Sequence, residues 1–177
     1  MADRLCKTLQ KDYNQSSAPV TGRRYCCNCG QVMQPKKVLV PVSGSTADEE
    51  AIRLACRLSK KGGGKIFVTY VIQVERTLPL DAEIRPEIER AEKALDQAEV
   101  MAEEEGCSVE TDLLQSREVG PAVVDEAIER GVDLIAIGAG YEKKFGEFNL
   151  GETIPYVLKN APCRVLVCRE PIPEEER

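Results

Sequence analysis

Hydrophobic residues between positions 36 and 170 gather in five short runs, separated by longer segments in which apolar residues recur at helical spacing. The runs have the length of strands, and the spacing of three to four between apolar residues is typical of amphipathic helices. Strands that alternate with helices predict a mainly parallel sheet with helices on both faces. The predicted strands cover residues 38–42, 66–72, 109–115, 134–137 and 165–168, and the third, being more polar, suits a sheet edge. The fifth could instead pair with a second copy of the chain.

The segments between the runs carry helix boundary signals. Thr46 and Glu49 have the spacing of a capping box, ahead of a helix predicted from about residue 48 to 59. Glycines at 62–64 end this helix, and Pro86 opens the next, because proline suits a first helical turn. A third helix is predicted from 120 to 130, and a short fourth one stops before residue 162.

The second predicted helix is highly charged, but its apolar residues follow alternating gaps of four and three. This narrow apolar face predicts a helix that packs on the sheet and leaves its charges in solvent. The same spacing would fit a coiled-coil seam, which a pattern this short and Ala-rich does not favour. The apolar residues are Ile84, Ile88, Ala91, Leu95, Ala98 and Ala102.

Small residues follow the first and the fourth predicted strands. Ser43, Gly44 and Ser45 follow the first, and glycines follow the fourth. Ligands of open parallel sheets bind at the carboxyl ends of strands, where the strand order reverses. Glycines let a ligand approach the backbone, and N–H groups at a helix start point outward. The two loops therefore predict a site for an anion or a nucleotide. The glycines of the second loop are Gly138, Gly140, Gly146 and Gly151.

Charge and hydropathy restrict the possible partners. The net charge is -6 and the pI is near 5.0, which argues against nucleic acid, whose phosphates require clustered Lys and Arg. No apolar run approaches the roughly 20 residues of a bilayer span, and the N-terminus lacks a signal-peptide pattern, so we expect a cytoplasmic protein without membrane insertion. We expect a flexible N-terminal extension over 1–35, one domain over 36–170 and an acidic tail over 171–177.

The eight cysteines predict reduced thiols, since four of them (Cys56, Cys107, Cys163 and Cys168) fall on or beside predicted core elements. Cys26, Cys27 and Cys29 form a tight cluster in the extension. A structural zinc site usually needs two separated Cys pairs, so an exposed thiol-rich tail is the favoured interpretation, with a metal or redox role as the alternative. Histidine is absent, which excludes His-based catalytic triads and His-containing metal sites.

Three segments in this order and spacing resemble the universal stress protein family: VLVPVSGS, GPAVVDEAIERGVDLIAIG and LGETIPYVLKNAPCRVLVCRE. The resemblance implies an open, doubly wound five-stranded parallel sheet of order 3-2-1-4-5. It also implies a three-layer α/β/α fold of the Rossmann-like, adenine nucleotide alpha hydrolase-like type. Family members commonly form homodimers through the last strand, here residues 163–169.

Family members that bind ATP share a loop in which Gly-x-x-Gly is followed, nine residues later, by Gly-Ser or Gly-Thr. Gly138 and Gly151 match the first and third glycines, but Tyr141 replaces the second and Glu152 replaces the hydroxyl residue. A carboxylate there would repel a polyphosphate unless a cation, Lys143 or Lys144 offset it, and Thr153 comes one residue late. The relatives usually carry Asp where Ser43 stands, although serine still offers a hydrogen bond.

The resemblance therefore implies a regulatory module that binds ATP or AMP, with Mg²⁺ as a possible companion. The alternative is a homodimeric interaction module without nucleotide, in which Tyr141, Phe145 and Phe148 fill the pocket or form a contact surface. No catalytic constellation is present, so we expect no enzyme, with slow ATP hydrolysis as a side activity still open. The nucleotide-binding candidates are Pro41, Val42, Ser43, Val71, Gly138, Gly140, Tyr141, Gly151, Glu152 and Thr153.

Overall fold

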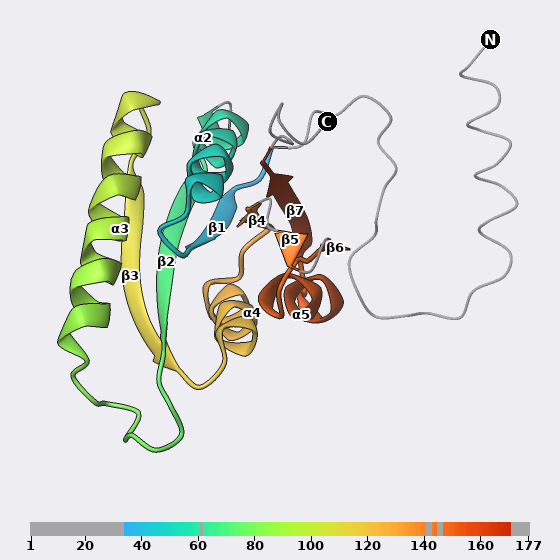
Figure 1. The fold of residues 1–177 in the computed structure, drawn as a ribbon. Helices are drawn as coiled ribbons and strands as arrows, with labels where there is room; N and C mark the ends of the chain where they lie inside the picture. The colour runs from blue at the N-terminus through green and yellow to red at the C-terminus, as the bar shows by residue number, and fades with distance from the viewer. Residues whose placement is uncertain (1–33, 61, 141–142, 145–146, 171–177) are drawn as a thin grey trace, which may run out of the picture. The chain divides into compact units, whose positions relative to one another are not determined.

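A computed structural model describes residues 34–60, 62–140, 143–144 and 147–170 of the 177-residue chain. Five parallel strands form one sheet in the order β3-β2-β1-β4-β7 (Figure 1). This confirms the expected order 3-2-1-4-5, places the polar third strand at an edge, and pairs the last strand with β4. The strands are β1 (Lys37–Val42), β2 (Lys65–Gln73), β3 (Val109–Ser116), β4 (Leu134–Ala139) and β7 (Arg164–Arg169).

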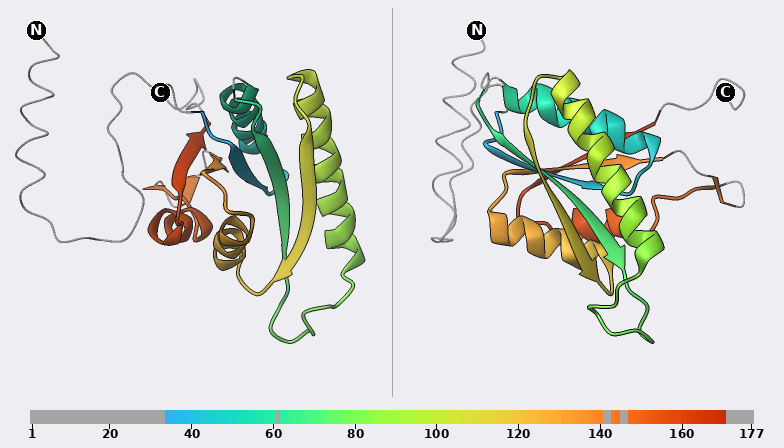
Figure 2. Two further views of the ribbon diagram at one scale, coloured as in Figure 1. Left: turned by 180° about the vertical axis from the view of Figure 1, so that it is seen from behind. Right: turned by 90° about the vertical axis from the view of Figure 1, so that its left-hand side faces the viewer.

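Two helices cover each face of the sheet (Figures 1 and 2). On one face lie α2 (Thr46–Lys60) and α3 (Arg85–Glu104), and on the other lie α4 (Val119–Arg130) and α5 (Thr153–Asn160). A short antiparallel pair, β5 (Lys143–Lys144) and β6 (Glu147–Phe148), comes between β4 and α5. The three layers of the predicted α/β/α fold are thus confirmed.

The apolar core follows from the alternation of side chains along the strands. In β1, Val38 and Val40 pack with Ala51 and Ala55 of α2, whereas Leu39 packs on the opposite face with Val123 of α4. All six side chains are 0% exposed. A strand that is buried on both faces needs a continuous apolar run, which is why this segment shows no polar alternation.

The charged helix α3 packs on the sheet as its apolar spacing predicts. Its buried residues are Ala91, Ala94, Leu95, Ala98 and Ala102, a narrow stripe that faces β2 and β3. The small Ala side chains allow the helix to lie close to the strands. At 20 residues α3 is long, but it is strongly polar, and nowhere in the described part of the chain does a helix have the length and apolarity to cross a membrane.

The two central strands part before their carboxyl ends. β1 pairs with β2 over six residues but with β4 only at Val38 and Leu39. At the opposite end, the Asp133 carboxylate accepts hydrogen bonds from the backbone N–H groups of Lys36 and Lys37, at 3.0 and 3.2 Å. Pro41, which has no N–H to donate to a neighbouring strand, lies beyond the last pair. A gap between β1 and β4 therefore begins in the middle of the sheet.

The four cysteines of the described residues are free thiols. Cys56 of α2 is fully buried, and burial raises its pKa to about 12. The Cys107 thiol donates to the Cys56 carbonyl at 3.7 Å, and burial also raises the pKa values of Cys163 and Cys168. The Cys26, Cys27 and Cys29 cluster lies outside the described residues, as do almost all of the 1–35 extension and the 171–177 tail.

Candidate functional site

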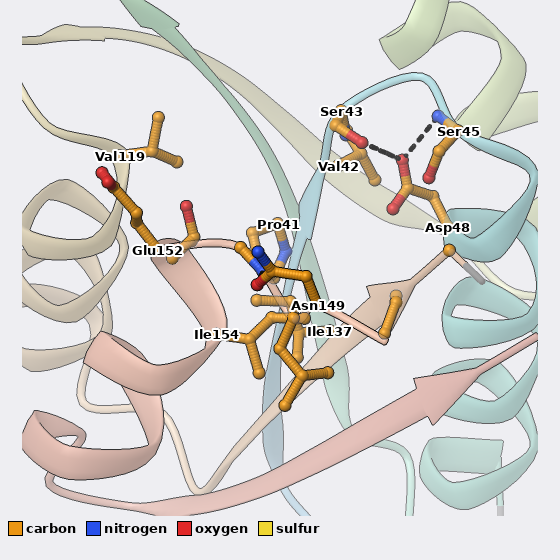
Figure 3. Close-up of a pocket in the computed structure, with 16 residues that line it drawn as sticks. Pro41, Val42, Ser43, Ser45, Asp48, Val119, Ile137, Asn149, Glu152 and Ile154 are labelled. Atoms are coloured by element: carbon orange, nitrogen blue, oxygen red, sulfur yellow. Dashed lines mark hydrogen bonds between the residues drawn. The ribbon is translucent and has the colours of Figure 1, made fainter. Parts of the chain in front are cut away.

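A cavity of about 310 Å³ lies where β1 and β4 part, at the carboxyl ends of both strands. We call it the crevice (Figure 3). Its walls come from the end of β1 and the first turn of α2 on one side, and from the end of β4 and the start of α5 on the other. The lining residues are Pro41, Val42, Ser43, Ser45, Asp48, Val119, Ile137, Gly138, Ala139, Gly140, Asn149, Leu150, Gly151, Glu152, Thr153 and Ile154.

Most residues that the sequence nominated for this site do line the crevice: Pro41, Val42, Ser43, Gly138, Gly140, Gly151, Glu152 and Thr153. The structure does not bring Val71 there. Its side chain packs with Leu39 and Phe67 in the core beneath α4. Tyr141, Phe145 and Gly146 lie outside the described residues. The residues that sequence reasoning missed include Asp48 and Asn149.

Asp48 organises the loop between β1 and α2. Its Oδ2 atom accepts hydrogen bonds from the Ser43 backbone N–H at 2.7 Å, the Ser43 hydroxyl at 3.1 Å and the Ser45 backbone N–H at 2.9 Å (Figure 3). The Asp48 side chain is buried, with 6% of the residue exposed. Two backbone N–H groups of the loop that precedes α2 are therefore satisfied by a carboxylate of the chain itself.

The helix cap differs from the prediction. Because α2 begins at Thr46, the capping residue is Ser45, whose carbonyl accepts the Asp48 N–H at 3.1 Å while Asp48 accepts the Ser45 N–H. The predicted capping box of Thr46 and Glu49 is wrong by one residue. The Thr46 hydroxyl instead donates to the Glu170 carboxylate beyond β7. The local signal was present, since Ser45 and Asp48 have the same spacing of three.

Gly138 is required by packing between β4 and α2. A Cβ atom at this position would lie 2.7 Å from the backbone carbon and oxygen of Ala47 and 2.8 Å from the Asp48 nitrogen. Non-bonded atoms do not approach so closely, so only glycine lets the first turn of α2 rest on the end of β4. The sequence predicted that Gly138 lets a ligand approach the backbone, and the structure adds that Gly138 is needed for the packing of α2 on β4.

Gly151 has different requirements. Its φ of 68° lies in the left-handed region, and a Cβ atom there would meet no heavy atom within 4 Å. Its N–H donates to the Asn149 side-chain oxygen at 2.9 Å. The following residue, Glu152, caps α5 without a side-chain hydrogen bond and extends toward Val119 (Figure 3). Gly151 therefore allows the turn before α5, and its backbone N–H already donates to the Asn149 side chain.

The described lining of the crevice is acidic. It contains the carboxylates of Asp48 and Glu152, and it contains neither Lys nor Arg. In the described part of the chain, no group of three or more Cys, Asp or Glu side chains is arranged to hold a metal ion. A ligand of the crevice thus meets negative charge, serine hydroxyls and apolar walls from Val42, Ile137 and Ile154.

A second cavity of about 660 Å³ adjoins the crevice and shares Val119, Glu152 and Thr153 with it. It is bounded by the ends of β2 and β3, and Arg76 and Arg117 are among its lining residues. Arg117 donates to the backbone carbonyl of Leu78 at 2.7 Å and to that of Val74 at 3.3 Å, so its guanidinium holds the loop after β2. The crevice is thus one part of a longer hollow across the carboxyl edge of the sheet.

Comparison with known proteins agrees with this architecture. Residues 35–169 match the model of the universal stress protein family. The chain is 30% identical over 142 residues to universal stress protein MJ0531 of Methanocaldococcus jannaschii, covering 77% of this chain and 83% of the relative.

Solved structures of the family share the fold. A universal stress protein from Archaeoglobus fulgidus superposes with a TM-score of 0.64 at 24% identity, covering 74% of this chain and 96% of that one. The structure from the same organism in complex with dAMP superposes with a TM-score of 0.60 at 23% identity, covering 76% and 98%. The extent of the family match and the relatedness to MJ0531 lead to one conclusion: the chain belongs to the universal stress protein family.

Proposed function

We propose that this protein is a regulatory module that binds an adenine nucleotide in the crevice between β1 and β4. The observation that carries the proposal is the crevice itself, which brings Ser43, Ser45 and Asp48 together with residues 138–140 and 149–154 at the carboxyl edge of a parallel sheet. A structure of similar fold was solved in complex with dAMP, which supports an adenine compound as the ligand.

In this proposal Pro41, Val42 and Ser43 contact the nucleoside part, and the loop from Gly138 to Gly151 receives phosphate. Thr153, at the first turn of α5, offers a hydroxyl near the position where ATP-binding relatives carry one. Lys143 and Lys144 would supply positive charge, and Mg²⁺ would offset the Glu152 carboxylate if a triphosphate bound.

Isothermal titration calorimetry with AMP and ATP, with and without Mg²⁺, tests the proposal. Thr153 lines both cavities, so Thr153→Trp should obstruct the hollow and abolish binding, whereas Thr153→Ser keeps the hydroxyl and should bind as the parent does. In a two-dimensional NMR titration, AMP should shift the amide signals of residues 43–48 and 149–153. The absence of heat and of amide shifts at millimolar nucleotide would contradict the proposal.

The alternative function is a homodimeric interaction module without nucleotide. It is favoured by one observation: the outward backbone donors at Ser43, Ser45 and Gly151 are already paired with Asp48 and Asn149. Loop N–H groups that the chain itself pairs need no ligand to satisfy them. The titrations above separate the two functions, because the alternative expects no nucleotide effect on the crevice amides.

Homodimerisation through β7 is part of the proposal in either case. β7 is an edge strand, with β4 on one side and no neighbour on the other within the described part of the chain. Unpaired edges present N–H and C=O groups to a second chain. Light scattering should give about twice the monomer mass of 19.5 kDa. A monomer mass at all concentrations would contradict this assignment.

We further infer that the module works in the cytoplasm and without catalysis of its own. Free thiols at Cys56, Cys107, Cys163 and Cys168 suit a reducing compartment. The crevice offers two carboxylates and hydroxyls but no His base, so any hydrolysis of ATP would be slow. A phosphate-release assay that found many turnovers per second would contradict a purely regulatory role.

A further inference from the structure

We propose that Asp48 is a specificity-determining residue of the crevice, and that it selects adenosine and its monophosphate over the triphosphate. This inference rests on the proposed function, since it names which adenine compounds the same crevice accepts. It is carried by three observations on the described residues: an Asp48 carboxylate oxygen that faces the crevice without a partner, the acidic lining, and the Gly151 N–H that already donates to Asn149.

The Asp48 carboxylate has one satisfied oxygen and one unsatisfied oxygen. Oδ2 accepts three hydrogen bonds, from Ser43 and Ser45, whereas Oδ1 accepts none from any described residue. Figure 3 shows this second oxygen directed toward the open centre of the crevice. Although 6% of the residue as a whole is exposed, Oδ1 is not among the buried side-chain atoms that lack a partner, so it is accessible from the crevice. A ligand in the crevice can therefore donate a hydrogen bond to this charged oxygen.

The hydrogen-bond inventory of the ligand decides which of its parts faces Asp48. A ribose has hydroxyl donors and an adenine has an amino donor, whereas an ionised phosphate has acceptors only. The three hydrogen bonds to Oδ2 also fix the Asp48 side chain, so it does not turn away from the ligand. Asp48 therefore binds the nucleoside part, and phosphate lies away from it.

The charge of the crevice opposes additional phosphates. Asp48 and Glu152 both line it, and the described lining offers neither Lys nor Arg to offset them. In the loop that receives phosphate, the Gly151 N–H already donates to Asn149. Each added phosphate charge thus increases the repulsion by Asp48 and Glu152 without gaining this donor. The free energy of binding becomes less favourable from AMP to ATP.

Calorimetric titration of the full chain with adenosine, AMP and ATP tests this selection. EDTA is present so that no divalent cation bridges Asp48 to phosphate. The parent protein should bind ATP about tenfold more weakly than AMP, and higher salt should narrow the difference because it screens charge. Asp48→Asn should bind adenosine about tenfold more weakly, through loss of a hydrogen bond to a charged acceptor, and its ratio of ATP to AMP dissociation constants should fall several-fold.

Asp96→Asn is the matched control, because Asp96 lies on the exposed side of α3 away from the crevice and its replacement should leave all three affinities unchanged. Glu152→Gln is a second test that does not involve the Asp48 hydrogen bonds. It should lower the ATP to AMP ratio, because it removes one carboxylate charge from the lining of the crevice. If Asp48→Asn unfolds, as seen by circular dichroism, Glu152→Gln decides the charge argument.

The possible failures are distinguishable. If none of the three compounds binds the parent protein, the proposed function fails and this inference fails with it. If AMP binds but the ratio is the same in the parent, Asp48→Asn and Glu152→Gln, the selection by these carboxylates is refuted and nucleotide binding stands. Tighter binding of ATP than of AMP by the parent protein in EDTA would also overturn the inference.

Discussion

Replacing Gly138 with alanine tests whether this glycine serves the packing of α2 or only a ligand. The added Cβ atom would lie 2.7 Å from the Ala47 carbonyl carbon and oxygen and 2.8 Å from the Asp48 nitrogen. All three are backbone atoms of the first helical turn, so no side-chain rotation relieves the overlap. Either α2 or the end of β4 has to move by a substantial fraction of an ångström.

The expected destabilisation follows from two opposing terms. Overpacking in a well-packed interior costs about 1–3 kcal/mol. Replacing glycine also reduces the conformational entropy of the unfolded chain, which returns roughly 0.4–1 kcal/mol where the native conformation suits alanine. We therefore expect Gly138→Ala to lower the free energy of unfolding by about 1–2 kcal/mol, which corresponds to a fall in Tm of roughly 2–8 °C for a domain of this size.

Gly140→Ala is the matched control two residues away. A Cβ atom at Gly140 would lie 3.9 Å from its nearest heavy atom, a Glu170 carboxylate oxygen, and Gly140 is not among the positive-φ glycines. Its replacement should be neutral or stabilising by a few tenths of a kcal/mol. Urea unfolding of the ligand-free protein, followed by circular dichroism, measures both. Equal stability of the two variants would refute the packing role of Gly138.

Two further predictions concern charge away from the crevice. Arg130→Met should destabilise the protein by about 3 kcal/mol in urea unfolding, because it leaves the Glu126 carboxylate, on a side chain that is 10% exposed, without its ion-pair partner. The same substitution removes the guanidinium that lies 4.5 Å from the centre of the Phe67 ring. Adding Glu126→Gln should recover a large part of this loss, and no recovery would contradict the ion-pair explanation. The Cys56 thiol has a folded-state pKa raised from 9.0 to about 12, so its contribution to stability is present below pH 9 and is lost between about pH 9 and 12. Above pH 9 the free energy of unfolding should fall more steeply in the parent than in Cys56→Ala, by up to about 1.4 kcal/mol per pH unit. If the free energies of unfolding of the two proteins fall in parallel with pH, the Cys56 thiol does not cause the loss of stability.

The fold was predictable because burial leaves a direct mark on the sequence. Val38, Leu39 and Val40 form a continuous apolar run, and a strand covered on both faces requires one. The alanine stripe of α3 likewise appears as apolar residues at gaps of three and four. Strand ends were less predictable. β4 continues to Ala139, past the predicted end at Ile137, because its partner β7 continues as far as Arg169.

The site was predictable as a place but not as a set of interactions. Loop position placed Ser43, Gly138 and Gly151 at one crevice. The role of Asp48 depends on a contact across the first helical turn, and the sequence offered Thr46 and Glu49 as an equally spaced pair. Val71 was misplaced for a related reason: its position near the end of β2 is correct, but side-chain alternation directs it into the core beneath α4.

The contact between Gly138 and Ala47 ties the two walls of the crevice together at its base. Two backbones touch there without a side chain between them, so the start of α2 is packed directly on the end of β4. At Gly151 a Cβ atom would meet no heavy atom within 4 Å. The two glycines that match the family loop thus differ in kind: Gly138 is required by close packing, and Gly151 by its backbone conformation.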